Sequence, residues 1–149
     1  MRFQTFSATL VLCTSLFFTP FALAEVHEVK MLNRDAHAAM AYEPEFLKIA
    51  PGDTVKFIAS SSGHNAASIA GMVPANTTSF MGKINQEIAI TLTEDGLYGV
   101  KCSPHYAMGM VMLIQVGENA LDSLSIPSDV PESAQKRFKD IVSRATKNR

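Results

Sequence analysis

The chain has 149 residues, with 13 lysines and arginines against 14 aspartates and glutamates. Its net charge of −1 excludes the strongly basic surface that binding to nucleic acid or to an anionic membrane requires. A chain of this length is expected to form one ordinary domain with a sizeable core.

Residues 1–24 are typical of a secretory signal peptide. Arg2 provides the positive start, residues 8–18 form an apolar run broken only by small or hydroxyl residues, and Ala22-Leu23-Ala24 is a small-x-small cleavage signal. The apolar stretch is too short for a comfortable membrane span, so a retained anchor helix is the weaker interpretation. A lipid anchor on Cys13 is also disfavoured, because a leucine precedes this cysteine where a small residue is expected. We therefore expect cleavage after Ala24 and no membrane attachment of the mature chain.

Cleavage leaves 125 of the 149 residues, numbers 25–149, in an oxidising compartment. Cys102 is then the only cysteine, so an internal disulfide is impossible. An unpaired thiol is a liability in such a compartment unless it is buried, catalytic or bound to a metal. Burial as a small apolar side chain is the plainest of these interpretations.

Between residues 26 and 116, short apolar stretches alternate with turn signals such as Pro51-Gly52-Asp53, which predicts β-strands. The last strand is apolar on both faces except at Gln115, so it should lie inside the structure. The pattern predicts a mainly β fold, an antiparallel two-sheet β-sandwich. The predicted strands lie around residues 28–31, 46–50, 54–59, 88–93, 97–101 and 110–116.

After Gly117 the pattern becomes helical. A short helical turn is expected within residues 118–124, and Pro131 is well placed as the first residue of a longer helix. Apolar residues then recur at helical spacing, which predicts a C-terminal α-helical tail packed on the sandwich. We expect a single domain over residues 25–149, with the sandwich in residues 25–117 and the helical extension in residues 118–149.

The chemically informative segment is the loop of residues 102–110 between two predicted strands. It can bring a thiolate from Cys102, an imidazole from His105 and a thioether from Met110 to one end of the sandwich. His64, which follows the strand of residues 54–59, is the candidate for a fourth ligand. Two imidazoles, one thiolate and a distant thioether form the ligand set of blue-copper sites. The sequence therefore predicts one copper ion and transfer of single electrons.

Other interpretations remain open from the residues alone. Single histidines and methionines are often plain structural residues. Zinc would more naturally collect several cysteines or a carboxylate, and iron–sulfur clusters usually need four cysteines. Cys102 and His105 could form a thiol catalyst, but no oxyanion-stabilising group is evident, so we expect no enzymatic activity. A copper chaperone or store is a further alternative, which four enclosed ligands disfavour.

Six stretches of the chain carry a family resemblance: Ala50-Pro51-Gly52-Asp53-Thr54-Val55, Gly63-His64-Asn65, Gly71-Met72-Val73-Pro74, Tyr98-Gly99-Val100-Lys101-Cys102, Pro104-His105-Tyr106 and Met108-Gly109-Met110. They resemble those of the pseudoazurins, a family of type 1 blue-copper proteins of the cupredoxin class, and the resemblance extends over essentially all of residues 25–149. It implies an eight-stranded Greek-key sandwich and a type 1 copper ion at His64, Cys102, His105 and Met110, with Met108 outside the site.

The resemblance also implies a monomeric electron carrier of the periplasm. Its partners would be copper nitrite reductase or c-type cytochromes, bound transiently through an apolar patch at His105 ringed by lysines. Ser62 and Met81 stand where family members often carry lysine, so the expected attraction to nitrite reductase is weaker. Asn65 is expected to tie the His64 loop to the Cys102 loop, and His64 to be the more enclosed of the two histidines.

Overall fold

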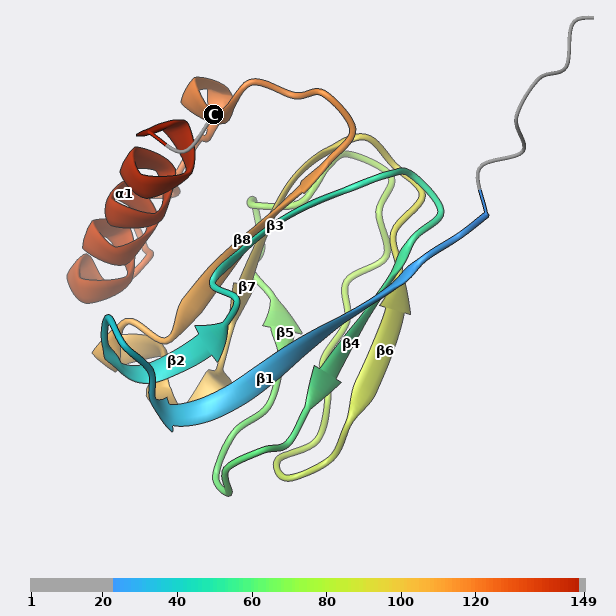
Figure 1. Ribbon diagram of the computed structural model, residues 1–149. Helices are drawn as coiled ribbons and strands as arrows, with labels where there is room; N and C mark the ends of the chain where they lie inside the picture. Colours follow the sequence, from blue (N-terminus) through green and yellow to red (C-terminus); the bar gives the residue numbers. More distant parts are fainter. Residues whose placement is uncertain (1–22, 148–149) are drawn as a thin grey trace, which may run out of the picture.

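Eight strands in two sheets form the sandwich within residues 23–147, the part of the chain that the computed structural model describes (Figure 1). The predicted signal segment lies outside these residues, except for its last two positions. One sheet has the strand order β2-β1-β4-β6 and the other the order β3-β8-β7-β5. The strands are β1 (Val26–Arg34), β2 (Ala39–Glu43), β3 (Phe46–Ile49), β4 (Thr54–Ile58), β5 (Ala67–Ser68), β6 (Ile88–Thr91), β7 (Gly96–Lys101) and β8 (Val111–Val116).

The two-sheet sandwich is confirmed, but the expectation of purely antiparallel sheets is wrong. β1 runs parallel to β4, with Val26 opposite Thr54, and β3 runs parallel to β8, with Phe46 opposite Leu113. The chain leaves the first sheet after β2, enters the second as β3 and returns as β4. Alternating side chains reveal which face of a strand is buried, whereas such crossovers between sheets decide its direction. Both sheets are therefore mixed.

β8 is buried at all six positions, as its apolar sequence predicts, and lies between β3 and β7. Its side chains divide between two cores. Met112 and Ile114 point into the core between the sheets, whereas Val111 and Leu113 point to the opposite face and pack against the C-terminal helix. A strand covered on both sides in this way needs apolar residues at consecutive positions.

The C-terminal extension contains a short 3-10 helix, η2 (Leu121–Ser123), and the helix α1 (Glu132–Lys147). α1 begins one residue after Pro131, whose carbonyl accepts a hydrogen bond from the backbone N–H of Gln135 (2.9 Å). Phe138 and Ile141 are fully buried and attach α1 to the outer face of the second sheet (Figure 1). The predicted helical tail is thus confirmed. No helix within residues 23–147 has the length and apolar character needed to cross a bilayer.

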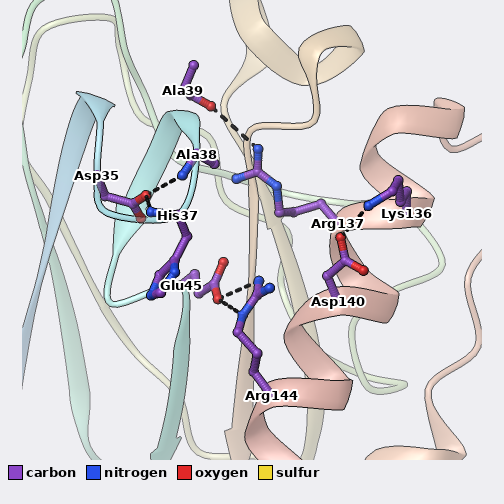
Figure 2. A network of polar contacts seen from close by, with 9 residues as sticks. All are labelled: Asp35, His37, Ala38, Ala39, Glu45, Lys136, Arg137, Asp140 and Arg144. Atoms are coloured by element: carbon purple, nitrogen blue, oxygen red, sulfur yellow. Dashed lines mark hydrogen bonds and ion pairs between the residues drawn. The ribbon is translucent and has the colours of Figure 1, made fainter.

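Two arginines link α1 to the start of β2 and to the segment that connects β2 with β3 (Figure 2). Arg144 places Nη2 and Nε 2.6 and 2.7 Å from Oε1 of Glu45, whose side chain is only 14% exposed. Arg137 donates a longer hydrogen bond to the carbonyl of Ala39 (3.4 Å). These contacts bind the polar side of the helix to the sandwich, so α1 is fixed from both its apolar and its polar face.

The turn between β3 and β4 is organised by the buried carboxylate of Asp53. Oδ1 accepts a hydrogen bond from the backbone N–H of Glu25 (2.9 Å). Oδ2 lies 3.0 Å from both the backbone nitrogen of Ala50 and Nε2 of His27. The pKa of Asp53 lies below its ordinary value. The hydrogen bond from Glu25 is the largest cause, and the hydrogen bond from His27 is the next. The carboxylate therefore ties the start of β1 to this turn.

Replacing Asp53 by asparagine is expected to lower the free energy of unfolding at pH 7 by about 1–3 kcal/mol, because buried donors lose a charged acceptor. The folded pKa lies below the unfolded value, so the contribution of the carboxylate is complete above an unfolded pKa of about 3.9. It is lost as the pH falls through the folded pKa. Urea unfolding between pH 7 and pH 2 should show the parent and variant converging in acid. A difference that stays constant to pH 2 would contradict this role.

Candidate metal centre

The loop between β7 and β8 carries three of the four predicted ligands. Cys102 directly follows β7, and His105 lies in the 3-10 helix η1 (Ser103–Met108). The backbone N–H of Cys102 donates to the carbonyl of Met110 (3.0 Å), and that of Met110 donates to the carbonyl of His105 (3.2 Å). Gly109 closes the loop in the left-handed region, at φ 85°. These bonds hold the three residues close together on one folded loop.

His64 comes from a second loop, between β4 and β5, and its ring meets the other two donors. Its Nδ1 lies 3.1 Å from Nδ1 of His105 and 3.6 Å from Sγ of Cys102. The remaining side of this triangle, from Sγ to Nδ1 of His105, measures 3.5 Å. Three ligands at about 2.0–2.3 Å around one ion, spread at 120°, would stand about 3.5–3.8 Å apart. The triangle therefore fits a single metal ion, slightly contracted between the two nitrogens.

Met110 is fully buried in the same cluster as Cys102, directly before β8. Met108 is 55% exposed, as expected for a residue outside the site. His27 lies beside Asp53, and His37 lies near Glu45 at the side of α1 (Figure 2), so neither joins the three donor atoms. Two nitrogens and one sulfur from this group, with a thioether nearby in the chain, are the donors that copper favours.

The two histidines differ in exposure as expected. His64 is fully buried, whereas His105 is partly exposed. Burial, and then the charge of His105, hold the pKa of His64 below its ordinary value. A metal binds imidazole in its neutral form, so this environment favours the ligating state.

Burial raises the pKa of the Cys102 thiol, and backbone N–H groups of Asn65 and His105 partly oppose this effect. A thiolate is thus costly here without a positive charge beside it. A bound cation would supply that charge and stabilise the thiolate. The two N–H groups would withdraw charge from the sulfur, which influences the potential of such a centre.

The expected tie through Asn65 is confirmed. Its Oδ1 accepts a hydrogen bond from the backbone N–H of Ser103 (2.7 Å), and its Nδ2 donates to the carbonyl of Gly82 (2.9 Å) and to Oγ of Ser103 (3.2 Å). The hydroxyl of Tyr42 donates to the carbonyl of Asn65 (2.7 Å) from inside the core. One amide therefore joins the His64 loop to the Cys102 loop.

Two further asparagines position His64, and the sequence did not predict either of these roles. Oδ1 of Asn33, in β1, lies 2.9 Å from Nε2 of His64. An Nε2–H that donates to this oxygen leaves the Nδ1 lone pair for a metal. Asn85 binds the same loop twice, by donating from its backbone to the carbonyl of His64 (2.9 Å) and by accepting from the N–H of Gly63. No local motif marks Asn33, because 31 residues separate it from His64.

Comparisons with known proteins agree with this geometry. A sequence model of the copper-binding proteins of the plastocyanin/azurin family matches residues 29–117. The chain is 43% identical over 117 residues to the pseudoazurin of Paracoccus pantotrophus, a match that covers 77% of this chain and 80% of that protein.

Solved structures give the same result. A pseudoazurin from Sinorhizobium superposes with a TM-score of 0.75 at 39% identity, covering 81% of this chain and 96% of the other. The native pseudoazurin of Hyphomicrobium denitrificans superposes with a TM-score of 0.73 at 36% identity, covering 80% and 97%. The chain therefore belongs to the copper-binding plastocyanin/azurin family, in which it groups with the pseudoazurins.

Proposed function

We propose that the protein is a periplasmic one-electron carrier and that its copper ion is held by His64, Cys102, His105 and Met110. The observation that carries the proposal is the triangle of two Nδ1 atoms and one Sγ, with sides of 3.1–3.6 Å, at one end of the sandwich. Two imidazoles and a thiolate with a weak thioether suit both Cu(I) and Cu(II), so the bound ion can give or take one electron.

The chain's own contribution is to hold the ligands still. Asn33 and Asn65 accept hydrogen bonds that fix the ring of His64 and the backbone beside Cys102. A rigid ligand frame limits the rearrangement that accompanies a change of oxidation state. Because His64 is buried and His105 is partly exposed, the electron enters and leaves through the edge of the His105 ring.

Transient redox partners would dock at the end of the sandwich that carries His105. Exposed apolar side chains occur in the ligand loop at Met108 (55% exposed) and in the segment after β5 at Met81 (70% exposed) and Ile84 (52% exposed). Positive charge is sparse there, with Arg34, Lys83 and Lys101 as its sources. Small, apolar and short-lived interfaces of this kind are typical of electron-transfer encounters. The proposed partners are a c-type cytochrome or a copper nitrite reductase, and the carrier itself is a monomer that makes and breaks no covalent bond.

The proposed location in the periplasm depends on removal of residues 1–24 and on a mature domain of residues 25–149. The pattern of a positive start, an apolar stretch and a small-x-small site supports it. β1 begins at Val26, so cleavage after Ala24 leaves every strand and its partners intact. The pseudoazurin relatives support the same location.

The direct test is the visible and electron paramagnetic resonance spectrum of the mature protein after addition of Cu(II). We expect intense visible absorption from thiolate-to-copper charge transfer and the small hyperfine splitting of a type 1 centre. Two controls separate the alternatives. A thiol catalyst would react with iodoacetamide while loaded with metal, and a copper chaperone would release copper rapidly to a mild chelator in both oxidation states. Colourless, axial Cu(II) binding would refute the proposal.

Replacing Met110 by leucine is expected to shift the reduction potential more than it weakens copper binding, because the axial thioether is a weak ligand. The buried side chain is similar in volume, so the fold should be retained. Voltammetry and a copper-binding titration on the same variant would measure the two effects. A collapse of copper affinity with little change of potential would show that Met110 is a strong ligand instead.

A further inference from the structure

The first turn of α1 touches the ligand loop directly. Oγ of Ser133 donates a hydrogen bond to the carbonyl of Ala107 (2.6 Å). A Cβ placed on Gly109 would lie only 2.9 Å from the backbone oxygen of Ser133, so glycine permits the two backbones to approach this closely. Figure 1 shows the start of α1 at the end of the molecule where the loop between β7 and β8 lies. The helix and the loop therefore form one contact surface.

This contact falls on the part of the loop that separates two proposed ligands. Ala107 lies two residues after His105, and Gly109 directly precedes Met110. The backbone N–H groups of Gly109 and Met110 both bind back to the preceding turn, to the carbonyls of Tyr106 (2.9 Å) and His105 (3.2 Å). A shift of the carbonyl of Ala107 would thus be transmitted to the spacing between His105 and Met110.

α1 can serve as a fixed support, because its own position is strongly determined. Phe138 and Ile141 are fully buried against the sheet, and Arg144 is held by Glu45 (2.6 Å). Tyr106 of the loop packs into the same apolar cluster as the helix, and its ring lies 4.7 Å from Nζ of Lys101. The loop therefore packs against both the sandwich and the helix.

We infer that Ser133 is a positioning residue of the copper site, which holds the Ala107 carbonyl and so fixes the spacing of His105 and Met110. The inference rests on the proposed function for its effect on copper, but the ordering of the loop is a property of the chain without metal. Loss of the hydroxyl leaves the carbonyl to water and allows the segment to move, which alters the approach of the weak axial thioether more than that of the three stronger ligands.

The test compares Ser133→Ala with Ser143→Ala, which removes a hydroxyl from another exposed serine of the same helix. In the metal-free protein, amide hydrogen exchange at Gly109 and Met110 should be about two- to thirteenfold faster in Ser133→Ala, the ratio equivalent to one hydrogen bond of about 0.5–1.5 kcal/mol. In the copper-loaded protein, Ser133→Ala should change three properties relative to the parent. These are the intensity ratio of the visible absorption bands, the electron paramagnetic resonance spectrum and the reduction potential. Ser143→Ala should leave all of these unchanged, and Ser133→Thr, which keeps the hydroxyl, should restore them.

Unchanged exchange rates at Gly109 and Met110 in Ser133→Ala would overturn the inference, as would equal shifts in Ser143→Ala. Faster exchange without any spectral or potential change would also overturn it, because the contact would then serve the fold alone. Failure of the parent protein to become blue would refute the proposed function separately. In that case faster exchange in Ser133→Ala would support the ordering role, and unchanged exchange would refute it.

Discussion

Replacing Cys102 by serine is expected to abolish the visible colour of the copper-loaded protein and to weaken copper binding by more than about 100-fold. The charge-transfer band requires a thiolate, and a hydroxyl at this position would not ionise to replace it. Loss of a residue that merely orients a ligand already costs about 10–100-fold in affinity, so loss of the ligand itself should exceed this range. Visible spectroscopy and a competition titration with a chelator would measure both effects.

The fold should survive the Cys102→Ser change, because the side chain keeps its size and lies among buried neighbours that are otherwise intact. Far-ultraviolet circular dichroism of the metal-free variant should match the parent. Alkylation gives an independent check, since copper should protect the buried thiol of the parent from iodoacetamide. Colour that persists in the serine variant would refute the assignment of Cys102 as a ligand.

Replacing Phe138 by alanine is expected to lower the free energy of unfolding by about 3–5 kcal/mol, the range found for large apolar core residues. The ring is fully buried and belongs to the cluster that joins α1 to the outer face of the second sheet, together with Leu113 and Ile141. Small domains are stable by only about 5–15 kcal/mol, so the loss is a large part of the total. Urea unfolding of the mature domain would measure it.

Lys139→Ala is the matched control, because Lys139 is the exposed neighbour of Phe138 on the same helix. Its effect should remain within about 0.5 kcal/mol. A loss below about 1 kcal/mol for Phe138→Ala would mean that α1 contributes little to the stability of the domain, and the support that we infer for the ligand loop would fail with it.

Much of the candidate site follows from local sequence. Cys102, His105 and Met110 occupy a short loop between two strands that pair antiparallel, so the ends of the loop are brought together. The burial of β8 also follows from local pattern, since its residues are apolar on both faces. The same holds for α1, whose apolar residues recur at helical spacing. These properties depend on neighbours in the chain, so composition and periodicity are enough to reveal them.

Only the tertiary structure decided which distant segments meet. It made both sheets mixed. It also brought three polar side chains within hydrogen-bonding distance of partners far away in the chain: Asn33 and His64 are 31 residues apart, Ser133 and Ala107 are 26 apart, and Arg144 and Glu45 are 99 apart. Each of these polar residues is also suited to an exposed position, so its identity carries no signal of its partner. Periodicity specifies the buried face of a strand or helix, whereas the choice of partner depends on how all the faces pack at once. The candidate ligands and the tie through Asn65 could therefore be proposed from sequence, whereas the roles of Asn33, Asn85 and Ser133 could not.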